Sequence, residues 1–185
     1  YNRLLGDWLS SQNERIHSPL LVAGGFYRIA RDIILESSYG EEFLKSEQDS
    51  RPERIFGELL PWFGQLAADE LGEQYDTLVL DEAQDLISLE NLDFLDLLLK
   101  GGLAGGNWCF FGDFTQQAIY GKGTREDRLK YLKNRCSSIA FSKLLTNCRN
   151  TRRIGEETAL LSGFDSLPYR LGQIDGLPVD YRYWE

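Results

Sequence analysis

The most informative segment of this chain is Asp76-Thr77-Leu78-Val79-Leu80-Asp81-Glu82-Ala83-Gln84-Asp85. Its apolar run from Leu78 to Leu80 is short and lies between polar residues, which predicts a buried strand. Two adjacent carboxylates follow at the carboxyl end of that strand, where open α/β sheets bind their ligands. One carboxylate there can hold Mg²⁺ among its water molecules, and the next can orient or deprotonate an attacking water. The stretch therefore indicates nucleotide hydrolysis. The alternative is that Asp81 or Asp85 stabilises a helix N-terminus.

Two later stretches repeat the arrangement of an apolar run followed by polar residues. The first ends in a turn residue and a carboxylate, then carries glutamines and aromatic residues, and the second leads from a strand-like start into Asn and Arg. They are Trp108-Cys109-Phe110-Phe111-Gly112-Asp113-Phe114-Thr115-Gln116-Gln117-Ala118-Ile119-Tyr120-Gly121 and Leu144-Leu145-Thr146-Asn147-Cys148-Arg149-Asn150-Thr151-Arg152-Arg153-Ile154. The spacing allows one helix between each pair of strands, and such alternation implies a mainly parallel sheet covered by helices on both faces.

In this order and spacing, the three stretches resemble motifs II, III and IV of the UvrD/Rep-like superfamily 1 DNA helicases. Residues 1–9 resemble motif Ia, and residues 21–29 resemble motif Ib, where the family more often has Thr-Phe-His. Residues 37–75 carry no motif. The resemblance implies an α/β fold: a RecA-like P-loop NTPase motor domain with a helical insertion, incomplete in this chain. It also implies an ATP-dependent helicase or translocase that moves on single-stranded DNA, with RNA left open.

The resemblance divides the chain into four parts. Residues 1–23, with motif Ia, and residues 76–145, with motifs II and III, would belong to the first RecA-like domain. Residues 24–75, which start near motif Ib, would form a helical insertion similar to the 1B domain of the family. Residues 146–185 would carry motif IV and the start of a second RecA-like domain.

One motif of the family does not occur in this sequence. Family members open with a P-loop, Gly-x-x-x-x-Gly-Lys-Ser/Thr, whose backbone amides and Lys bind the phosphates. The nearest string, Gly121-Lys122-Gly123-Thr124, lacks the leading Gly and has Gly directly after Lys. We therefore expect a fragment of a larger helicase, cut downstream of the P-loop and ending before motifs V and VI. The fragment alone is expected to be inactive.

The resemblance assigns an ATP and Mg²⁺ site residue by residue. Asp81 would coordinate Mg²⁺ through water, and Glu82, the second carboxylate of this metal site, would be the general base that activates the hydrolytic water. Gln84 and Asp113 would lie against the bound nucleotide. Arg149 would reach the γ-phosphate as a charge-assisted donor. Where the family usually has a Tyr that stacks on adenine, directly before this Arg, the chain has Cys148.

The glutamine that senses the γ-phosphate has two candidates. Counting forward from Asp113 by the family spacing selects Gln116, and counting back from Ile119 and Tyr120 selects Gln117. We prefer Gln117, because the segment around Tyr120 must keep its register with the nucleic acid.

Nucleic-acid contacts are implied at both ends of the first motor domain. Tyr120 would stack on a base, although Lys122 replaces the second aromatic residue that the family often has two positions later. Motifs Ia and Ib would add further contacts from the residues Asn2, Arg3, Phe26 and Tyr27.

Apolar periodicity and turn residues predict the elements along the chain. Helices are expected at residues 2–11, 26–37, 41–48, 52–71, 89–99, 125–135 and 151–162. Strands are expected around residues 20–22, 78–80, 108–111 and 139–145, with a further strand-like pattern at 177–185.

Composition is that of a soluble globular piece. The chain has 185 residues, of which 42% are hydrophobic, enough for one sizeable core. It has no run of about eighteen apolar residues that could cross a membrane. The three cysteines show no metal-ligand spacing and indicate free thiols in a reducing cytosol, so we expect a cytoplasmic protein. With 20 basic against 29 acidic residues and a net charge of −9, the fragment should bind nucleic acid weakly.

Two other classes of protein remain open. A degenerate helicase-like scaffold that binds a partner protein is favoured by Cys148, Lys122 and the acidic charge. An unrelated Mg²⁺ phosphohydrolase could use Asp81 and Asp113 from neighbouring strands, but it would usually need a nucleophile pattern such as Asp-x-Asp, which is missing. Glu82 and the glutamines after Asp113 favour the ATPase.

Overall fold

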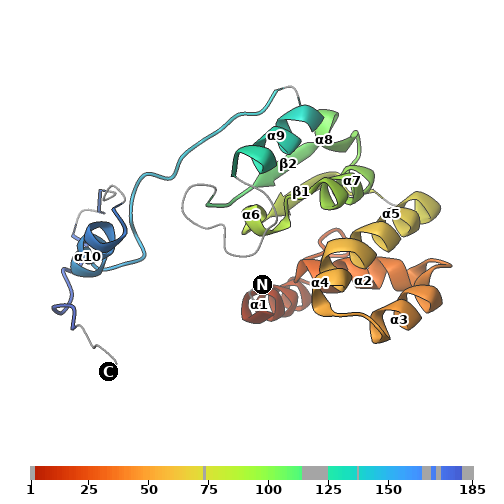
Figure 1. The fold of residues 1–185 in the computed structure, drawn as a ribbon, viewed down its shortest axis with the longest axis horizontal. Helices are drawn as coiled ribbons and strands as arrows, with labels where there is room; N and C mark the ends of the chain where they lie inside the picture. The colour runs from red at the N-terminus through yellow and green to blue at the C-terminus, as the bar shows by residue number, and fades with distance from the viewer. Residues whose placement is uncertain are drawn as a thin grey trace. The chain divides into compact units, whose positions relative to one another are not determined.

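A computed structural model describes residues 3–72, 74–113, 125–136, 138–163, 168–169 and 172–180. The chain forms two compact units, Tyr1–Ile139 and Ala140–Glu185. In the first unit the described elements are α1 (Arg3–Ile16), α2 (Phe26–Glu36), α3 (Gly40–Gln48), α4 (Pro52–Arg54), the π-helix η1 (Ile55–Leu59), α5 (Leu60–Leu71), β1 (Thr77–Leu80), α6 (Ala83–Leu86), α7 (Leu89–Leu98), α8 (Gly102–Gly105), β2 (Asn107–Phe110) and α9 (Arg125–Arg135) (Figure 1). The second unit contains α10 (Arg152–Ser162).

The predicted helices at residues 26–37, 41–48, 89–99, 125–135 and 151–162 are confirmed, each to within one residue at either end. The first helix is longer than expected, because the polar residues after Ser11 continue it to Ile16. It stops where His17 takes a left-handed conformation, with φ of 50°, two residues before Pro19. Pro19 cannot continue a helix, because it has no N–H group to donate.

The helix expected at residues 52–71 is continuous but changes its winding in the middle. Pro52 occupies the first turn, as predicted, and the five residues of η1 follow α4 directly. In η1 the N–H group of Leu60 donates to the carbonyl of Ile55, five residues earlier. The next residue is Pro61, whose ring would clash with the carbonyl four residues before it in a regular α-helix. The wider π-turn accommodates that ring, and the helix ends at Gly72, which has φ of 65°.

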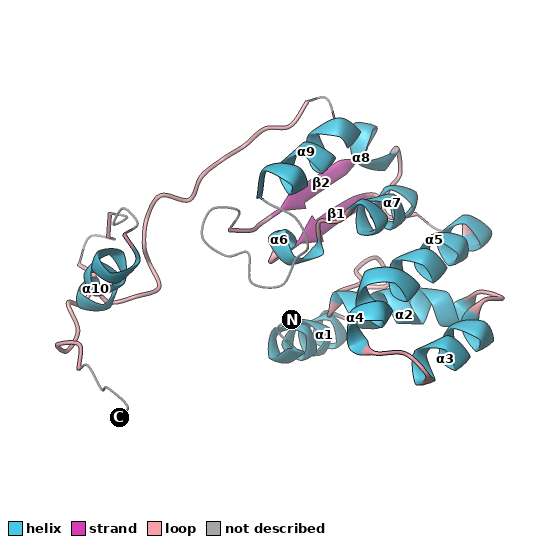
Figure 2. Cartoon of the chain, in the orientation of Figure 1, coloured by secondary structure: helices cyan, strands magenta, loops and turns pink. Residues whose placement is uncertain are grey.

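The sheet of the described residues consists of β1 and β2, which pair in parallel with Leu80 opposite Phe110 (Figure 2). Helices α6, α7 and α8 lie between these strands in the sequence. Parallel strands connected through helices establish the α/β character that the sequence predicted. The inward residues Leu78, Leu80, Trp108 and Phe110 belong to or pack on the core.

Two core clusters hold the first unit together, and α7 contributes to both. Phe94 and Leu98 pack with the residues of α2, α3 and α5, whereas Leu92 and Leu95 pack with β1, α8 and α9. A helix that is apolar on both sides is a buried helix. α7 therefore joins the helical part of the first unit to the sheet.

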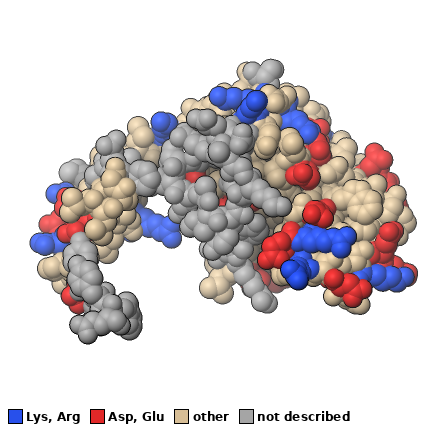
Figure 3. All heavy atoms as spheres, viewed as in Figure 1, with Lys and Arg blue, Asp and Glu red and all other residues tan. Residues whose placement is uncertain are grey.

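Charged side chains are mixed by sign on the surface. On the face drawn in Figure 3, the blue side chains of Lys and Arg lie among the red ones of Asp and Glu over the described part of the chain. Ion pairs join Lys100 to Asp76, Arg54 to Glu58 and Arg31 to Glu47. The three pairs couple part of the basic charge to carboxylates of the same chain.

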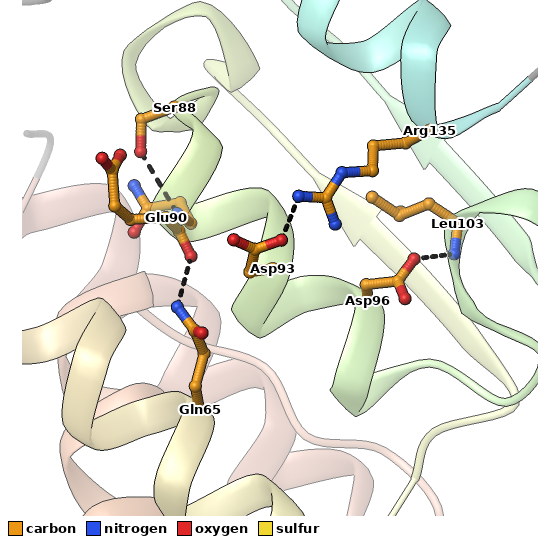
Figure 4. Close-up of polar contacts among 8 residues, drawn as sticks. Gln65, Ser88, Glu90, Asp93, Asp96, Leu103 and Arg135 are labelled. Carbon is orange, nitrogen blue, oxygen red and sulfur yellow. Dashed lines mark hydrogen bonds and ion pairs between the residues drawn. The ribbon is translucent and has the colours of Figure 1, made fainter.

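Polar contacts fasten α7 to its neighbours (Figure 4). At its start, the Ser88 hydroxyl accepts a hydrogen bond from the backbone N–H of Asn91, as expected of an N-cap residue. The Gln65 amide from α5 donates to the carbonyl of Glu90 over 3.1 Å, and the Asp96 carboxylate accepts from the backbone N–H of Leu103 over 2.8 Å. Asp93 pairs with Arg135 of α9. These contacts fix α7 against three other elements.

Two predicted strands are wrong. Residues 20–22 form no strand, and Leu20 is 94% exposed beside a turn in which Leu21 donates to the carbonyl of Ser18. Residues 139–145 have no regular secondary structure, and Leu144 is 86% exposed. Both segments were predicted from their apolar residues, and apolar character alone does not distinguish a strand from an exposed connection. The described residues 177–180 of the last expected strand are also without regular structure.

Candidate functional site at the carboxyl ends of β1 and β2

Three carboxylates predicted for the nucleotide site come together at one edge of the sheet. Asp81 and Glu82 follow β1 directly, and Asp113 lies three residues after the end of β2. Because the two strands run in parallel and Leu80 pairs with Phe110, their carboxyl ends lie side by side. The expected gathering of these residues is therefore found, while their chemical roles remain predictions.

Backbone hydrogen bonds hold the ends of the two strands together. The N–H of Phe111 donates to the carbonyl of Leu80 over 2.8 Å, and the N–H of Ala83 donates to the carbonyl of Phe111 over 2.8 Å. The chain leaving β1 thus turns across the end of β2 and enters α6. Figure 2 shows α6 beside the tips of both strands.

Glu82 is in a backbone conformation that costs energy. Its φ is 51° and its ψ is 39°, in the left-handed region that a non-glycine residue adopts at a cost of roughly 1–2 kcal/mol. The Asp81 carboxylate accepts a hydrogen bond from the N–H of Glu82 over 3.0 Å and supports this turn. Strained residues of this kind gather at functional sites, where the surrounding structure holds them. The conformation lets the two carboxylates follow the strand without a longer loop.

Gln84 connects the acidic turn to the end of β2. Its side chain is only 2% exposed, and its amide nitrogen donates to the Glu82 carboxylate over 2.7 Å. Its amide oxygen accepts from the backbone N–H of Asp113 over 3.1 Å. The side chain therefore bridges the residues that follow the two strands.

The carboxylates of Asp81 and Glu82 are exposed to solvent. No group of three or more His, Cys, Asp or Glu side chains that could hold a metal ion is found within the described residues. Mg²⁺ in phosphate-transfer sites keeps several waters and takes one or two carboxylates together with substrate phosphates. Asp81 and Glu82 fit such a partial donor set.

Arg149 belongs to the second unit, whose placement relative to the sheet is not determined. It is exposed and lies in a turn in which the Asn147 side chain accepts from the backbone N–H groups of Arg149, over 3.2 Å, and Asn150, over 3.1 Å. Such a turn is the usual local role of Asn. Cys148, beside it, is exposed.

The residues predicted to contact nucleic acid are placed only in part. Phe26 is half-buried, packs on both core clusters and meets Phe94 edge to face at 6.1 Å. The hydroxyl of Tyr27 donates to Glu47, and its ring packs on Phe56 at 5.3 Å. Arg3 begins α1, and its side chain lies outside the described residues. Also outside them are Asn2, Gln116, Gln117 and Tyr120.

Burial raises the pKa of the Tyr27 phenol above its ordinary value of 10.0. The hydrogen bond to Glu47 and the negative charge of that carboxylate act in the same direction, while Arg31 acts against them. Tyr27 is thus a structural link between α2 and α3 in this fold. A role in base stacking would compete with these contacts.

The bridging role of Gln84 and the strained turn at Glu82 are not apparent from the sequence. A buried amide beside two carboxylates becomes recognisable only when the partner on β2 is known. Left-handed residues are usually Gly, Asn or Asp, so Glu82 carries no sequence signal for its conformation. Both features depend on the pairing of two strands that are distant in sequence.

Comparison with protein-family models, with curated proteins and with solved structures finds no match to this chain. Within the part of the chain that the structure describes, no helix is long and apolar enough to cross a membrane. The resemblance to helicases therefore remains an expectation from the sequence motifs.

Proposed function

We propose that this chain is part of a UvrD/Rep-like superfamily 1 DNA helicase, a cytoplasmic protein that couples ATP hydrolysis to movement on single-stranded DNA. The observation that carries the proposal is the junction of two motif-like segments. The carboxylates of Asp81 and Glu82 follow one parallel strand, and Gln84 ties them to Asp113 after the next. Parallel α/β sheets bind ligands at this edge.

Each residue has a defined part in the proposed reaction. Asp81 would hold Mg²⁺ through water, and the metal would supply charge compensation for the phosphates of ATP. Glu82 would take a proton from the attacking water. Arg149, from the second unit, would donate to the phosphate that is transferred. The phosphate-binding amides and Lys would come from a P-loop in a longer protein, outside this chain.

The outer face of the sheet supports an incomplete motor domain. Val79 is 62% exposed, its partner Cys109 on β2 is exposed, and Phe111, directly after β2, is 47% exposed. Parallel sheets are almost always covered on both faces, and their strands are apolar on both sides. The run from Leu78 to Leu80 has that two-sided apolar character. Further layers of a larger domain would cover this face.

The test is ATP turnover by the longer protein that we propose, with Glu82→Gln against Glu90→Gln. Glu90 is also an exposed glutamate of the first unit, but it lies at the start of α7. Removing a general base costs about 10²–10⁴-fold in rate. We expect this loss for Glu82→Gln, with nucleotide binding retained, and none for Glu90→Gln. Near-normal turnover by Glu82→Gln would show that the base lies elsewhere.

The second candidate function is a helicase-like scaffold without ATPase activity. Cys148 favours it, because a thiol cannot stack on adenine as the family's Tyr does. A longer protein whose thermal stability does not change with Mg²⁺-ATP, and which releases no phosphate, would select the scaffold over the motor.

A further inference from the structure

The amide of Gln84 sits between two groups of opposite hydrogen-bonding character. The Glu82 carboxylate can only accept hydrogen bonds, and the backbone N–H of Asp113 can only donate one. The amide nitrogen faces the first over 2.7 Å and the amide oxygen faces the second over 3.1 Å. Turning the amide over would set an acceptor against an acceptor and a donor against a donor. The two partners therefore define the orientation of Gln84.

Glutamine is suited to this position because it offers one donor and one acceptor at a fixed separation. Glu at the same place would face the Glu82 carboxylate with a second carboxylate, and Leu would offer neither group. The side chain is 2% exposed, so water does not readily replace a lost partner. The Asp113 end is a backbone group, which moves only when the segment after β2 moves.

We infer that Gln84 is a positioning residue that makes the place of the Glu82 carboxylate depend on the backbone at Asp113. The residue acts through Glu82 and need not touch the substrate. Its value for catalysis rests on the proposed function, in which Glu82 is the base. In that reaction, a shift of the backbone at Asp113 would move the Glu82 carboxylate away from the attacking water. The segment that follows β2 would thus be coupled to the base that follows β1.

The bridge can be tested in this chain by amide hydrogen exchange. We expect the Asp113 N–H to exchange at least about fivefold faster in Gln84→Leu, which removes its acceptor, the factor that corresponds to a net hydrogen-bond contribution of about 1 kcal/mol. The N–H of Phe111, which donates to the backbone of Leu80, serves as the reference in the same molecule. Its exchange should be unchanged if the strands remain paired.

The matched control exchanges the two side chains. In Glu82→Gln with Gln84→Glu, the new amide at position 82 can donate to the new carboxylate at position 84, which still accepts from Asp113. We expect exchange of the Asp113 N–H to return to within about twofold of the wild-type rate. Unchanged exchange in Gln84→Leu, or fast exchange in the double variant while the Phe111 N–H still exchanges slowly, overturns the bridge. Should Gln84→Leu not fold, folding of the double variant, which can form both hydrogen bonds, supports the bridge, and failure of both variants to fold overturns it.

A kinetic test separates positioning from stability. In the longer protein, Gln84→Leu should lower kcat about tenfold and change KM for ATP by less than twofold, because the base is displaced while the phosphate-binding groups are not. Fast exchange at Asp113 with unchanged kcat overturns the positioning role. A wild-type protein without turnover instead refutes the proposed function, and the exchange experiment still decides whether the bridge exists.

Discussion

Gly64 on α5 lies so close to Phe94 on α7 that a β-carbon on Gly64 would be 3.0 Å from the Phe94 ring. Phe94 is fully buried in the cluster that joins the helical part to α7. The helices can approach to this distance only because residue 64 has no side chain. The contact couples the helices before β1 to the helix that supports the sheet.

Gly64→Ala should therefore destabilise the protein. Crowding in a packed core costs about 1–3 kcal/mol, which exceeds the gain in helix propensity of Ala over Gly, at most about 1 kcal/mol. Urea unfolding measures the difference. Gly57→Ala is the control, because nothing lies within 4 Å of the added carbon there, and we expect equal or higher stability. Equal stability of Gly64→Ala and wild type would mean that the Phe94 ring moves away from the added carbon with no loss in the free energy of unfolding.

Two neighbouring residues of β1 should respond differently to substitution. Leu80 is 8% exposed and belongs to the core, so Leu80→Ala should cost about 2–5 kcal/mol in the free energy of unfolding. Val79 is 62% exposed, and Val79→Thr should change stability by no more than about 0.5 kcal/mol. Denaturant titration of this chain compares them. In the longer protein, Val79→Thr should become clearly more costly if further layers cover this face.

Tyr27→Phe should change how stability depends on pH. Burial and Glu47 raise the pKa of the phenol above 10.0 in the folded protein, so folding favours the protonated form. The stability that Tyr27 contributes is fully present below pH 10, and it is lost as the pH rises through the raised pKa. The difference in unfolding free energy between wild type and Tyr27→Phe should thus narrow above pH 10. Other tyrosines titrate in both proteins and cancel. A constant difference across that range would contradict the burial of the phenol.

This chain by itself should release no phosphate from ATP. Its sequence has no P-loop, so the amide donors and Lys that bind the β- and γ-phosphates are missing. Asp81 and Arg149 alone leave most of the triphosphate charge uncompensated. Phosphate release is measured with and without single-stranded DNA. Turnover on the order of 1 s⁻¹ that disappears in Asp81→Ala would show that another element of this chain replaces the P-loop.

Local patterns predicted most of the helices and both strands. Helix signals that act over a few residues can be recognised in a sequence. Examples are Pro52 at a first turn, the N-cap Ser88 and the apolar spacing of α7. The same kind of local pattern predicted strands at residues 20–22 and 139–145, and both predictions were wrong. Their apolar residues have no partner strand, and apolar character alone does not distinguish a strand from an exposed connection.

Local sequence patterns were enough to predict β1, β2 and the longer helices, and they put a pair of carboxylates after one strand and a third carboxylate after the next. That these groups meet follows from the parallel pairing of the strands, with Leu80 opposite Phe110, and this pairing is known only from the fold. The tertiary structure also decided that Glu82 takes a left-handed turn and that Gln84 is buried between Glu82 and Asp113. Gln84 and Asp113 are 29 positions apart, so the hydrogen bond between them depends on how the two strands pair. A local sequence pattern does not predict strand pairing.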